Sequence, residues 1–477
     1  MTYETRATAA VIDYVTQSGL DRFPREAVTL AKQCIIDGLG VILAGSAAKG
    51  TAIVREYVRA GKEIGEATVL GGDTFTCRAA SAALVNGTAG HALDFDDTQL
   101  SSSPDRVFGL LTHPTIPPLA ASLAVGERLG VSGRQFLEAY LIGFEVECKM
   151  AEAINPTHYQ NGFHTSGTFG IFGAMISAAK LLGLNPESLG NALAIASSMS
   201  SGIRLNFGTM TKPLHVGRAA QNGVIAAELA AAGHTGGKEA LDSPWGFFRV
   251  FTLGAGFDAA QIVGALGNPP SILSPGVSLK PYPCGSLGHP SMDAMLKLVL
   301  THDVKPEQVK AIRFRAGSNI LNPLRYPIAR TELEAKFCPA FMMSSLVLRR
   351  KAGIHEFTDE FVQSALVQDM MRKVTTVRDQ AIEARGFDKM RSIIEVDLVD
   401  GRTLVQEADE RYRGGPEKPF MREELHGKFT DCASLVLHPG AIAATLDRLE
   451  SLEQVRDIRD VVTTVTSGVL EGQPVVL

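Results

Sequence analysis

The segment N-G-T-A-G-H-A-L-D-F-D-D-T, residues 86–98, sets a histidine and three carboxylates beside small apolar residues. His91 is followed closely by Asp94, Asp96 and Asp97, and the residues before it are mostly small or apolar. Because burying an unpaired carboxylate is costly, these groups need cations, hydrogen-bond donors or a metal ion. We therefore expect the fold to bring such partners to this segment from elsewhere in the chain.

The first half of the chain predicts a large helical domain. From residue 5 to about residue 270, apolar residues recur at helical spacing, and Gly, Pro or Asn separates one pattern from the next. Another helix carries Gly217, Ala220, Gly223 and Ala227, and we expect it to be central because small residues let helices approach closely. The other helices are predicted at 24–43, 51–60, 78–92, 115–129, 133–153, 166–182 and 186–198.

The period of the apolar pattern changes after residue 270. Alternation of apolar and charged residues is typical of strands, and an Asp-Gly pair between two such runs indicates a hairpin turn. Strands are predicted at 310–315, 391–399 and 402–405, with the turn at 400–401 and helices at 290–300 and 340–349. After residue 421 the helical pattern returns.

These patterns predict a mainly α protein with a second α+β domain. Residues 1–271 are expected to form the first part of the helical domain, and residues 272–405 the smaller α+β domain. The C-terminal segment, 406–477, is expected to return to the helical domain. The large domain would thus be built from both chain ends.

The composition is that of a globular protein. The 477 residues are 45% hydrophobic and 20% charged, with a net charge of −5 and no basic run, so nothing indicates nucleic-acid binding. Six scattered cysteines form no C-x-x-C pair, which argues against a disulfide framework or structural zinc and for a reducing compartment. With no apolar leader and no uncharged run of membrane-span length, we expect a cytoplasmic protein without a membrane partner.

Several basic side chains stand beside Pro or Gly where a helix is predicted to begin, and Lys212 is the clearest case. Pro213 places Lys212 at or just before a helix start, where the ammonium adds to free N–H groups and the helix dipole. Together they suit a substrate carboxylate. The alternative is that Lys212 forms an ordinary buried salt bridge with Asp94, Asp96 or Asp97. We expect the first, a substrate ligand rather than a structural pair.

A metal site is a second possibility for the acidic segment. His91 and Asp94 are three residues apart and could share one face of a helix, with Asp96 and His113 completing the ligands. However, the sequence contains no H-E-x-x-H or comparable two-histidine motif.

Four stretches in this order resemble the MmgE/PrpD family, which includes 2-methylcitrate dehydratase, cis-aconitate decarboxylase and iminodisuccinate epimerase. They are H-A-L-D-F-D-D-T at 91–98, G-F-H-T-S-G-T-F-G at 162–170, N-F-G-T-M-T-K-P-L-H-V-G-R-A-A-Q-N-G at 206–223 and K-P-Y-P-C at 280–284, and E-A-K-F-C-P-A-F at 334–341 extends the similarity. The resemblance implies a large helical domain, a smaller α+β lid domain and a homodimer.

The resemblance also implies an active site between the two domains, with no metal and no organic cofactor. This sequence departs from the decarboxylase pattern at Gly285, where that pattern has a histidine, and in the length of the insertion at 101–110. By motif match, the implied site residues are Asp94, Thr98, His113, His164, Lys212, Lys280 and Tyr326.

We therefore expect a cofactor-independent lyase or isomerase that acts on a small di- or tricarboxylate by loss of a proton or CO2 next to a carboxylate. Lys212, Lys280 and His164 would stabilise the developing charge, and Asp94 or His113 would be the acid or base. Thr98 and Tyr326 would orient the substrate. Because Gly285 supplies neither a cation nor a proton and would enlarge the pocket, we expect weak decarboxylation of cis-aconitate.

Two functions of other classes remain as alternatives. One is a metal-dependent hydrolase that uses His91, Asp94, Asp96 and His113. The other is a non-catalytic member that only binds a carboxylate.

Overall fold

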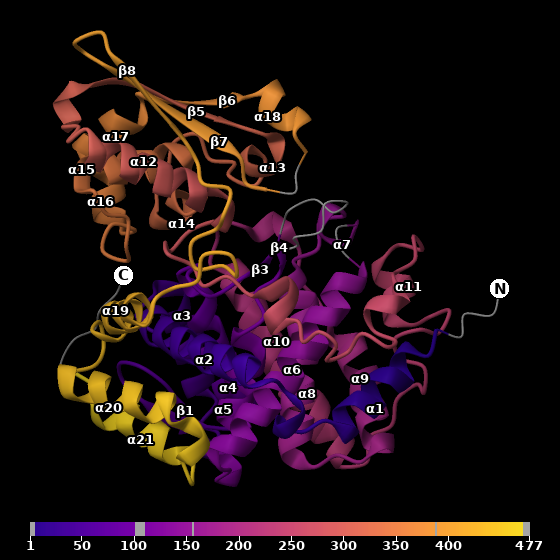
Figure 1. Cartoon of the computed structure of the whole chain (residues 1–477). Coiled ribbons are helices and arrows are strands. Elements are labelled where there is room, and N and C mark those ends of the chain that lie inside the picture. The colour runs from indigo at the N-terminus through magenta and orange to yellow at the C-terminus, as the bar shows by residue number, and fades with distance from the viewer. Residues whose placement is uncertain (1–4, 101–109, 155–156, 387–388, 471–477) are drawn as a thin grey trace.

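Two hydrophobic cores organise the computed structural model, which describes residues 5–100, 110–154, 157–386 and 389–470 (Figure 1). The larger core lies among helices from both ends of the chain, and the smaller core lies against a four-stranded sheet. The predicted fold class, mainly α with a second α+β domain, is confirmed.

Helix α10 (Thr211–Ala231) lies at the centre of the larger domain, packed against α8 and α4. A methyl group on Gly217 would lie 2.1 Å from Thr88 Oγ1, and one on Gly223 would lie 2.6 Å from Ala174 Cβ. Only glycine allows this close approach, which is why the small residues of α10 occupy its contact faces. The other helices of the first core before residue 271 are α1 (Ala7–Gln17), α2 (Arg25–Gly45), α3 (Lys49–Ala60), α4 (Ala79–Ala92), α5 (Ile116–Leu129), α6 (Gly133–Ile154), α8 (Thr165–Leu182), α9 (Pro186–Met199) and α11 (Phe247–Phe251). The short helix α7 (Thr157–Gln160) packs Tyr159 against the second core.

The end of the chain also packs on the first core. Helix α19 (Arg422–Ala433) lies against α2, and α20 (Pro439–Glu450) and α21 (Arg459–Ser467) follow it, as the yellow helices of Figure 1 show. Phe429 and Cys432 of α19 are buried among the apolar residues of the N-terminal helices.

Helix α2 is long and apolar enough, by length and composition, to cross a membrane, although no uncharged run of that length was found in the sequence. In the structure, 72% of its apolar window is buried inside the protein. Such burial is expected of a core helix, so its composition is weak evidence for a membrane span.

The pattern predicted a wholly helical domain, and the structure corrects this. Two short antiparallel pairs of strands interrupt it, one between α3 and α4 and the other between α4 and α5. These strands have only two or three residues, too few to show alternation in the sequence. The pairs join β1 (Ala67–Val69) to β2 (Phe75–Cys77) and β3 (Gln99–Leu100) to β4 (Leu110–Thr112).

The second core is formed by one sheet and the helices that cover one of its faces. Ile312 and Phe314 of β5 and Ile394 and Val396 of β7 are fully buried, as their alternation predicts. The strands are β5 (Val309–Ala316), β6 (Val374–Arg378), β7 (Ser392–Leu398) and β8 (Thr403–Glu407), and the helices are α12 (His289–Thr301), α13 (Ser318–Leu321), α14 (Glu332–Ala335), α15 (Pro339–Arg349), α16 (Asp359–Gln363), α17 (Ala365–Met371) and α18 (Gln380–Ala384).

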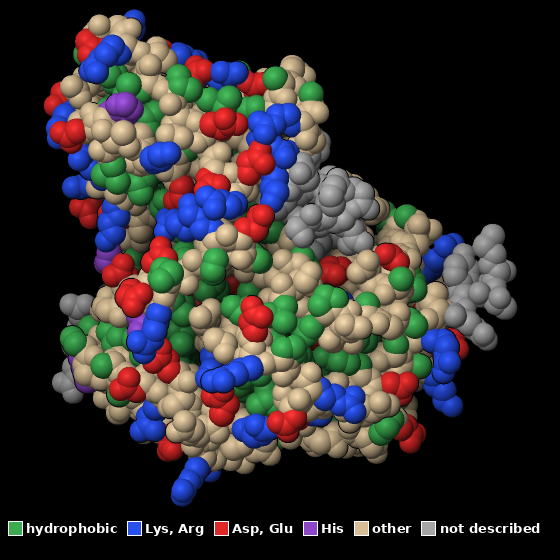
Figure 2. Space-filling model, in the orientation of Figure 1, with side chains coloured by type: hydrophobic (Ala, Val, Ile, Leu, Met, Phe, Trp, Pro, Cys, Tyr) green, Lys and Arg blue, Asp and Glu red, His purple; other side chains and the backbone are tan. Residues whose placement is uncertain are grey.

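The sheet has the order β6-β5-β7-β8, with β6 parallel to β5 and the other neighbours antiparallel. The sequence did not predict β6. Its residues Thr375 to Arg378 are exposed, so this edge strand shows no alternation of apolar and polar residues. On the face shown in Figure 2, basic and acidic side chains lie close together over both domains.

Candidate active site

The acidic turn, which we define as residues 92–97, begins at the last residue of α4 and lies at the centre of the site. Asp94 has a positive φ of 51°, an uncommon conformation for a residue other than glycine. The backbone carbonyls of the turn accept hydrogen bonds from side chains of four distant segments. The donors are Lys336 Nζ to Ala92 (3.4 Å), Lys280 Nζ to Asp94 (2.9 Å), Lys428 Nζ to Phe95 (2.8 Å) and His113 Nδ1 to Asp97 (2.7 Å).

Two lysines converge on the Asp94 carboxylate. Lys212 Nζ lies 2.5 Å and Lys280 Nζ 3.2 Å from Asp94 Oδ1, and all three side chains are at most 5% exposed. Burial by itself raises the pKa of Asp94, but Lys212 and Lys280 outweigh it and hold that pKa well below the usual value. Asp94 is therefore ionised. Two ammonium groups thus share one carboxylate in direct contact, and Asp96 acts on both lysines through longer-range electrostatics.

The expectation that Lys212 would not be a structural pair is wrong, because the structure pairs it with Asp94, as the alternative described, and Lys280 shares that carboxylate. Its role as a substrate ligand stays a prediction. Helix α10 also begins one residue before Lys212, at Thr211, so Lys212 lies in the first helical turn. Burial lowers its pKa, while Asp94 acts in the opposite direction.

His91 and Asp96 form a buried pair beside these lysines. His91 Nδ1 lies 2.9 Å from Asp96 Oδ1 and 2.8 Å from Oδ2. Burial favours the neutral form of Asp96, but the electrostatic interactions with His91 and His113 outweigh this effect. They lower the pKa of the Asp96 carboxyl. Burial also lowers the pKa of His91. A neutral His91 therefore donates from Nδ1, and its Nε2 is buried without a protein partner among the described residues.

His113 is held by the far end of the same turn. Because a carbonyl only accepts, His113 Nδ1 carries the proton donated to Asp97 O, and the lone pair lies on Nε2. Burial lowers the pKa of His113 well below its usual value, so the ring is neutral. The His91 and His113 rings are 4.6 Å apart between centroids.

The Asp97 side chain points to Thr115, just before α5. Thr115 Oγ1 lies 2.6 Å from Asp97 Oδ2, and Thr115 N donates to Oδ1 at 3.2 Å. Burial raises the pKa of Asp97 to about 8, against the effect of the Thr115 hydrogen bonds. Asp97 is thus a largely protonated carboxyl near neutral pH, unlike its neighbours Asp94 and Asp96.

His164 and Thr98 complete the inner part of the site. His164, at the start of α8, stacks near His91 with centroids 5.7 Å apart, and its Nδ1 lies 3.0 Å from His215 Nδ1. Burial lowers the pKa of His164 well below its usual value. Like His91 Nε2, the atoms His164 Nε2 and Thr98 Oγ1 are buried and have no partner among the described residues. Buried polar atoms are normally hydrogen-bonded, so this cluster suits a polar ligand.

Tyr326 lies at the edge of the site rather than within the ion cluster. It is part of the second domain and only half-buried, and its hydroxyl lies 3.5 Å from Phe207 O. The Phe207 ring connects it to the site, since that ring lies 5.1 Å from the His164 ring and 5.2 Å from Lys212 Nζ. The other six predicted site residues, Asp94, Thr98, His113, His164, Lys212 and Lys280, are all buried.

The proposed hydrolase ligands do not assemble as one set. His91, Asp96 and His113 have ligand atoms within 4.8 Å of one another, but Asp94 is not among them because two lysines hold it. The Nδ1 atoms of both histidines already donate to Asp96 and to Asp97 O. A metal ion there would have to bind the histidines through Nε2 or displace these bonds.

Gly285 does not enlarge the site as expected. A methyl group built on it would lie 3.0 Å from Leu324 Cδ2 and 3.3 Å from Lys336 O, so neighbouring residues fill that space. Most of the insertion at 101–110 lies outside the described residues.

Sequence reasoning missed the partners of the turn. His91 was considered only as a metal ligand, and Asp96 as a metal ligand or a partner of Lys212. The quoted motif at 334–341 contains Lys336, which was not singled out, and the motif at 206–223 contains His215, which was not singled out either. Lys428 gave no signal, because its place in α19 looks like an exposed polar position until the helix packs on α2.

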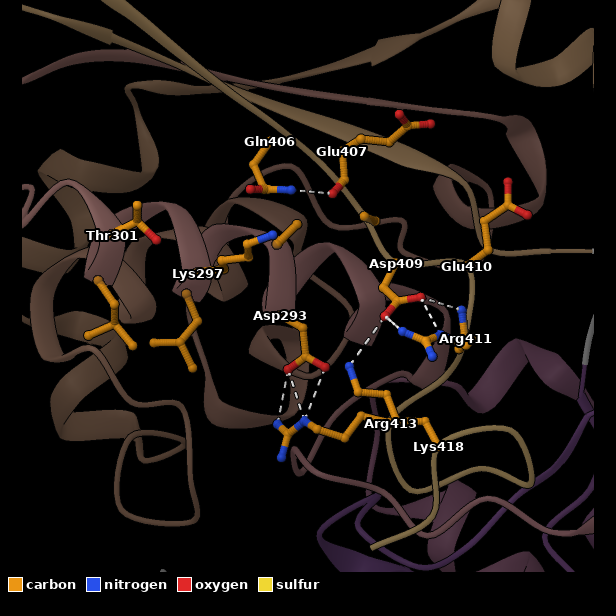
Figure 3. Close-up of a pocket in the computed structure, with 14 residues that line it drawn as sticks. Asp293, Lys297, Thr301, Gln406, Glu407, Asp409, Glu410, Arg411, Arg413 and Lys418 are labelled. Atoms are coloured by element: carbon orange, nitrogen blue, oxygen red, sulfur yellow. Dashed lines mark hydrogen bonds and ion pairs between the residues drawn. The ribbon is translucent and has the colours of Figure 1, made fainter.

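The cleft in Figure 3 lies away from the acidic turn. It has a volume of about 950 Å³ and is lined by α12 and by the segment from Gln406 to Lys418. Its charges are largely paired within the cleft: Arg413 binds Asp293, and Arg411 and Lys418 bind Asp409. A second cleft of about 960 Å³ is lined by residues of α9, of α11 and of the segment that precedes α11, all within the range 194–251. The predicted site residues line neither cleft.

Comparison with known proteins agrees with the resemblance. Residues 9–260 match the MmgE/PrpD N-terminal domain, and residues 282–466 match the MmgE/PrpD C-terminal domain. The chain is 29% identical to cis-aconitate decarboxylase of Mus musculus, over 85% of this chain and 82% of that protein. It is 29% identical to that of Homo sapiens over 85% and 83%, and 24% identical to that of Aspergillus terreus over 93% of each chain.

The two domain models together span most of the sequence, in the order in which they occur in the chain. The named relatives are decarboxylases, which are lyases. These matches, together with the buried site and its lysines, support neither of the two alternatives, the metal-dependent hydrolase and the member that only binds a carboxylate. The chain belongs to the MmgE/PrpD family and is a lyase of the MmgE/PrpD type.

Proposed function

We propose that this lyase acts on a small di- or tricarboxylate, such as cis-aconitate, 2-methylcitrate or iminodisuccinate, without a metal or organic cofactor. One observation carries the proposal: Lys212 and Lys280 converge on a single buried carboxylate, Asp94. Two ammonium groups contact only this one carboxylate, so a substrate carboxylate could bind beside Asp94 as their second anionic partner.

The lysines would act where charge develops. When a proton or CO2 leaves the carbon next to a carboxylate, the bonding electron pair stays on the substrate and spreads onto the carboxylate oxygens. Lys212 and Lys280 are fixed by Asp94 in a buried site, where such electrostatic stabilisation is strongest. His164 Nε2, which has no partner among the described residues, would contact the same substrate.

His113 suits the transfer of a proton better than Asp94. Asp94 is held ionised by two lysines, so it attracts a proton weakly. The neutral His113 ring has its lone pair on Nε2 and is oriented by Asp97 O. With its lone pair on Nε2, His113 would remove a proton from the substrate in elimination or epimerisation. Thr98 and Tyr326 would orient the substrate.

The substrate is tested by incubating purified protein with each of the three compounds in D2O and following the reaction by 1H NMR. Loss of water, loss of CO2 or uptake of deuterium at carbon would identify the reaction. Turnover of at least one compound by the wild type, and its loss in Lys212→Met, supports the proposal. No turnover of any of them would overturn the proposed substrate class.

The relatives' name makes cis-aconitate the first compound to test. The expectation from Gly285 that its decarboxylation is weak stays a prediction. So do the homodimer and the cytoplasmic location, which the resemblance and the composition imply.

A further inference from the structure

Lys428, from the C-terminal helix α19, reaches the acidic turn across 333 residues of sequence. Its Nζ donates to Phe95 O at 2.8 Å and lies 2.7 Å from Asp37 Oδ1 of α2. The ammonium also lies 3.9 Å from the centroid of the Phe95 ring. The Lys428 side chain is 7% exposed and that of Asp37 is 1% exposed, so their contact is shielded from solvent. Burial raises the pKa of Asp37, and Lys428 acts in the opposite direction.

These contacts fix the backbone between two functional carboxylates. Phe95 lies between Asp94, whose positive φ is uncommon, and Asp96, which holds His91. A hydrogen bond to Phe95 O holds the peptide plane that joins residue 95 to residue 96, and the ring contact holds the side chain of residue 95. The Asp37 carboxylate holds the ammonium in place from the other side.

We propose that Lys428 is a positioning residue: it holds the acidic turn in the conformation that places Asp94 on Lys212 and Lys280, and Asp96 on His91. The catalytic importance of the turn rests on the proposed function. The C-terminal segment thereby contributes to the active site although none of its residues belongs to the predicted site.

Lys428→Met removes the donor and the charge but keeps the length of the side chain. It should lower kcat by at least about ten-fold, the effect of losing one charge-assisted hydrogen bond, while KM changes little. Lys428→Arg keeps a buried cationic donor and should restore most of kcat. The substrate is whichever of cis-aconitate, 2-methylcitrate or iminodisuccinate the wild type turns over.

Arg55→Met is the matched control. Arg55 is also a buried cation that binds backbone carbonyls, those of Leu70, Gly71 and Asp73, in a turn of the same domain. This variant should lower the melting temperature without lowering kcat. If Lys428→Met keeps kcat within about two-fold of the wild type, or if Arg55→Met loses as much kcat as Lys428→Met, the proposal is overturned.

Hydrogen–deuterium exchange of residues 91–98 tests the same idea without a substrate. Exchange there should be faster in Lys428→Met than in Arg55→Met under conditions where both are folded, and equal exchange contradicts the proposal. Should Lys428→Met not fold, Asp37→Asn, which keeps an oxygen acceptor, should raise exchange in the same segment, and unchanged exchange overturns the proposal. If the wild type turns over none of the three compounds, the proposed function fails while the exchange result still decides on Lys428.

Discussion

Asp94 and Lys212 form a buried ion pair with 2.5 Å between Oδ1 and Nζ, although 118 residues separate them in the chain. Lys280 shares the same oxygen. The pair is therefore part of a group in which two ammonium groups contact one carboxylate, with Asp96 nearby. Changing the number of charges in this group should change both the stability of the site and its affinity for an anion.

The stability of variants should follow the charge balance of this group. Lys212→Met leaves Asp94 paired with Lys280, whereas Asp94→Asn leaves two buried ammonium groups without a carboxylate. Because an uncompensated buried charge is the costly species, Asp94→Asn should lower the melting temperature more than Lys212→Met. Thermal unfolding of the two variants at neutral pH measures this, and the reverse order would contradict it.

Lys212→Met should also reduce kcat/KM. Loss of one charge-assisted hydrogen bond to a substrate carboxylate costs about 1.5–3 kcal/mol, or roughly ten- to two-hundred-fold. Steady-state kinetics on the substrate found by NMR gives the value. If Lys212 and Asp94 form only a structural pair, kcat/KM of the variant should fall only in proportion to the loss of folded protein.

His113→Gln should lower kcat by about a hundred-fold or more, the usual contribution of a general acid or base. His158→Gln is the control, since both nitrogens of His158 already have protein partners, Phe251 O and Thr168 Oγ1. Because the pKa of His113 is well below 6.5, the wild type should keep the neutral ring, and its activity as a base, below pH 6. Equal loss of kcat in both variants would point to general damage to the domain.

Asp97 should make the protein less stable as the pH rises. Its pKa is about 8 in the folded protein and 3.8 in the ordinary state, so the unfolded chain ionises first. The stability cost therefore begins near pH 4, grows until about pH 8 and then stays constant. Asp97→Asn mimics the protonated form, so its melting temperature relative to the wild type should rise over that range. A difference that does not change with pH would show that Asp97 is ionised in the fold.

Turnover should survive treatment with EDTA. The ligand atoms of His91 and His113 that face Asp96 and Asp97 O are engaged in hydrogen bonds, and two lysines lie beside them. Activity and metal content are measured before and after chelation. Activity lost with EDTA and restored by one divalent ion would favour a metal centre at His91, Asp96 and His113.

Conversion of cis-aconitate to itaconate should be weak or absent in the wild type, because Gly285 provides neither a cation nor a proton. Itaconate formation is measured by 1H NMR, and its rate is compared with the rates of turnover of 2-methylcitrate and iminodisuccinate at equal substrate concentration. Itaconate as the fastest product would contradict this and would mean that another group supplies the proton.

The sequence alone determined the architecture and most of the elements. Apolar residues at helical spacing located helices such as α5 and α8 to within a residue or two, because their periodicity is local. Alternation located β5 and β7 for the same reason. It failed for the exposed edge strand β6. Family motifs named the residues of the site, because those motifs are short and continuous.

Only the tertiary structure decided which charges meet. The sequence placed Lys212 at a helix start but could not choose between a substrate and Asp94, since that choice depends on the packing of α10 against α4. It gave no sign of Lys428, whose partners Asp37 and Phe95 lie hundreds of residues away. Long-range electrostatic contacts depend on burial and distance, and both are properties of the folded chain rather than of any local pattern.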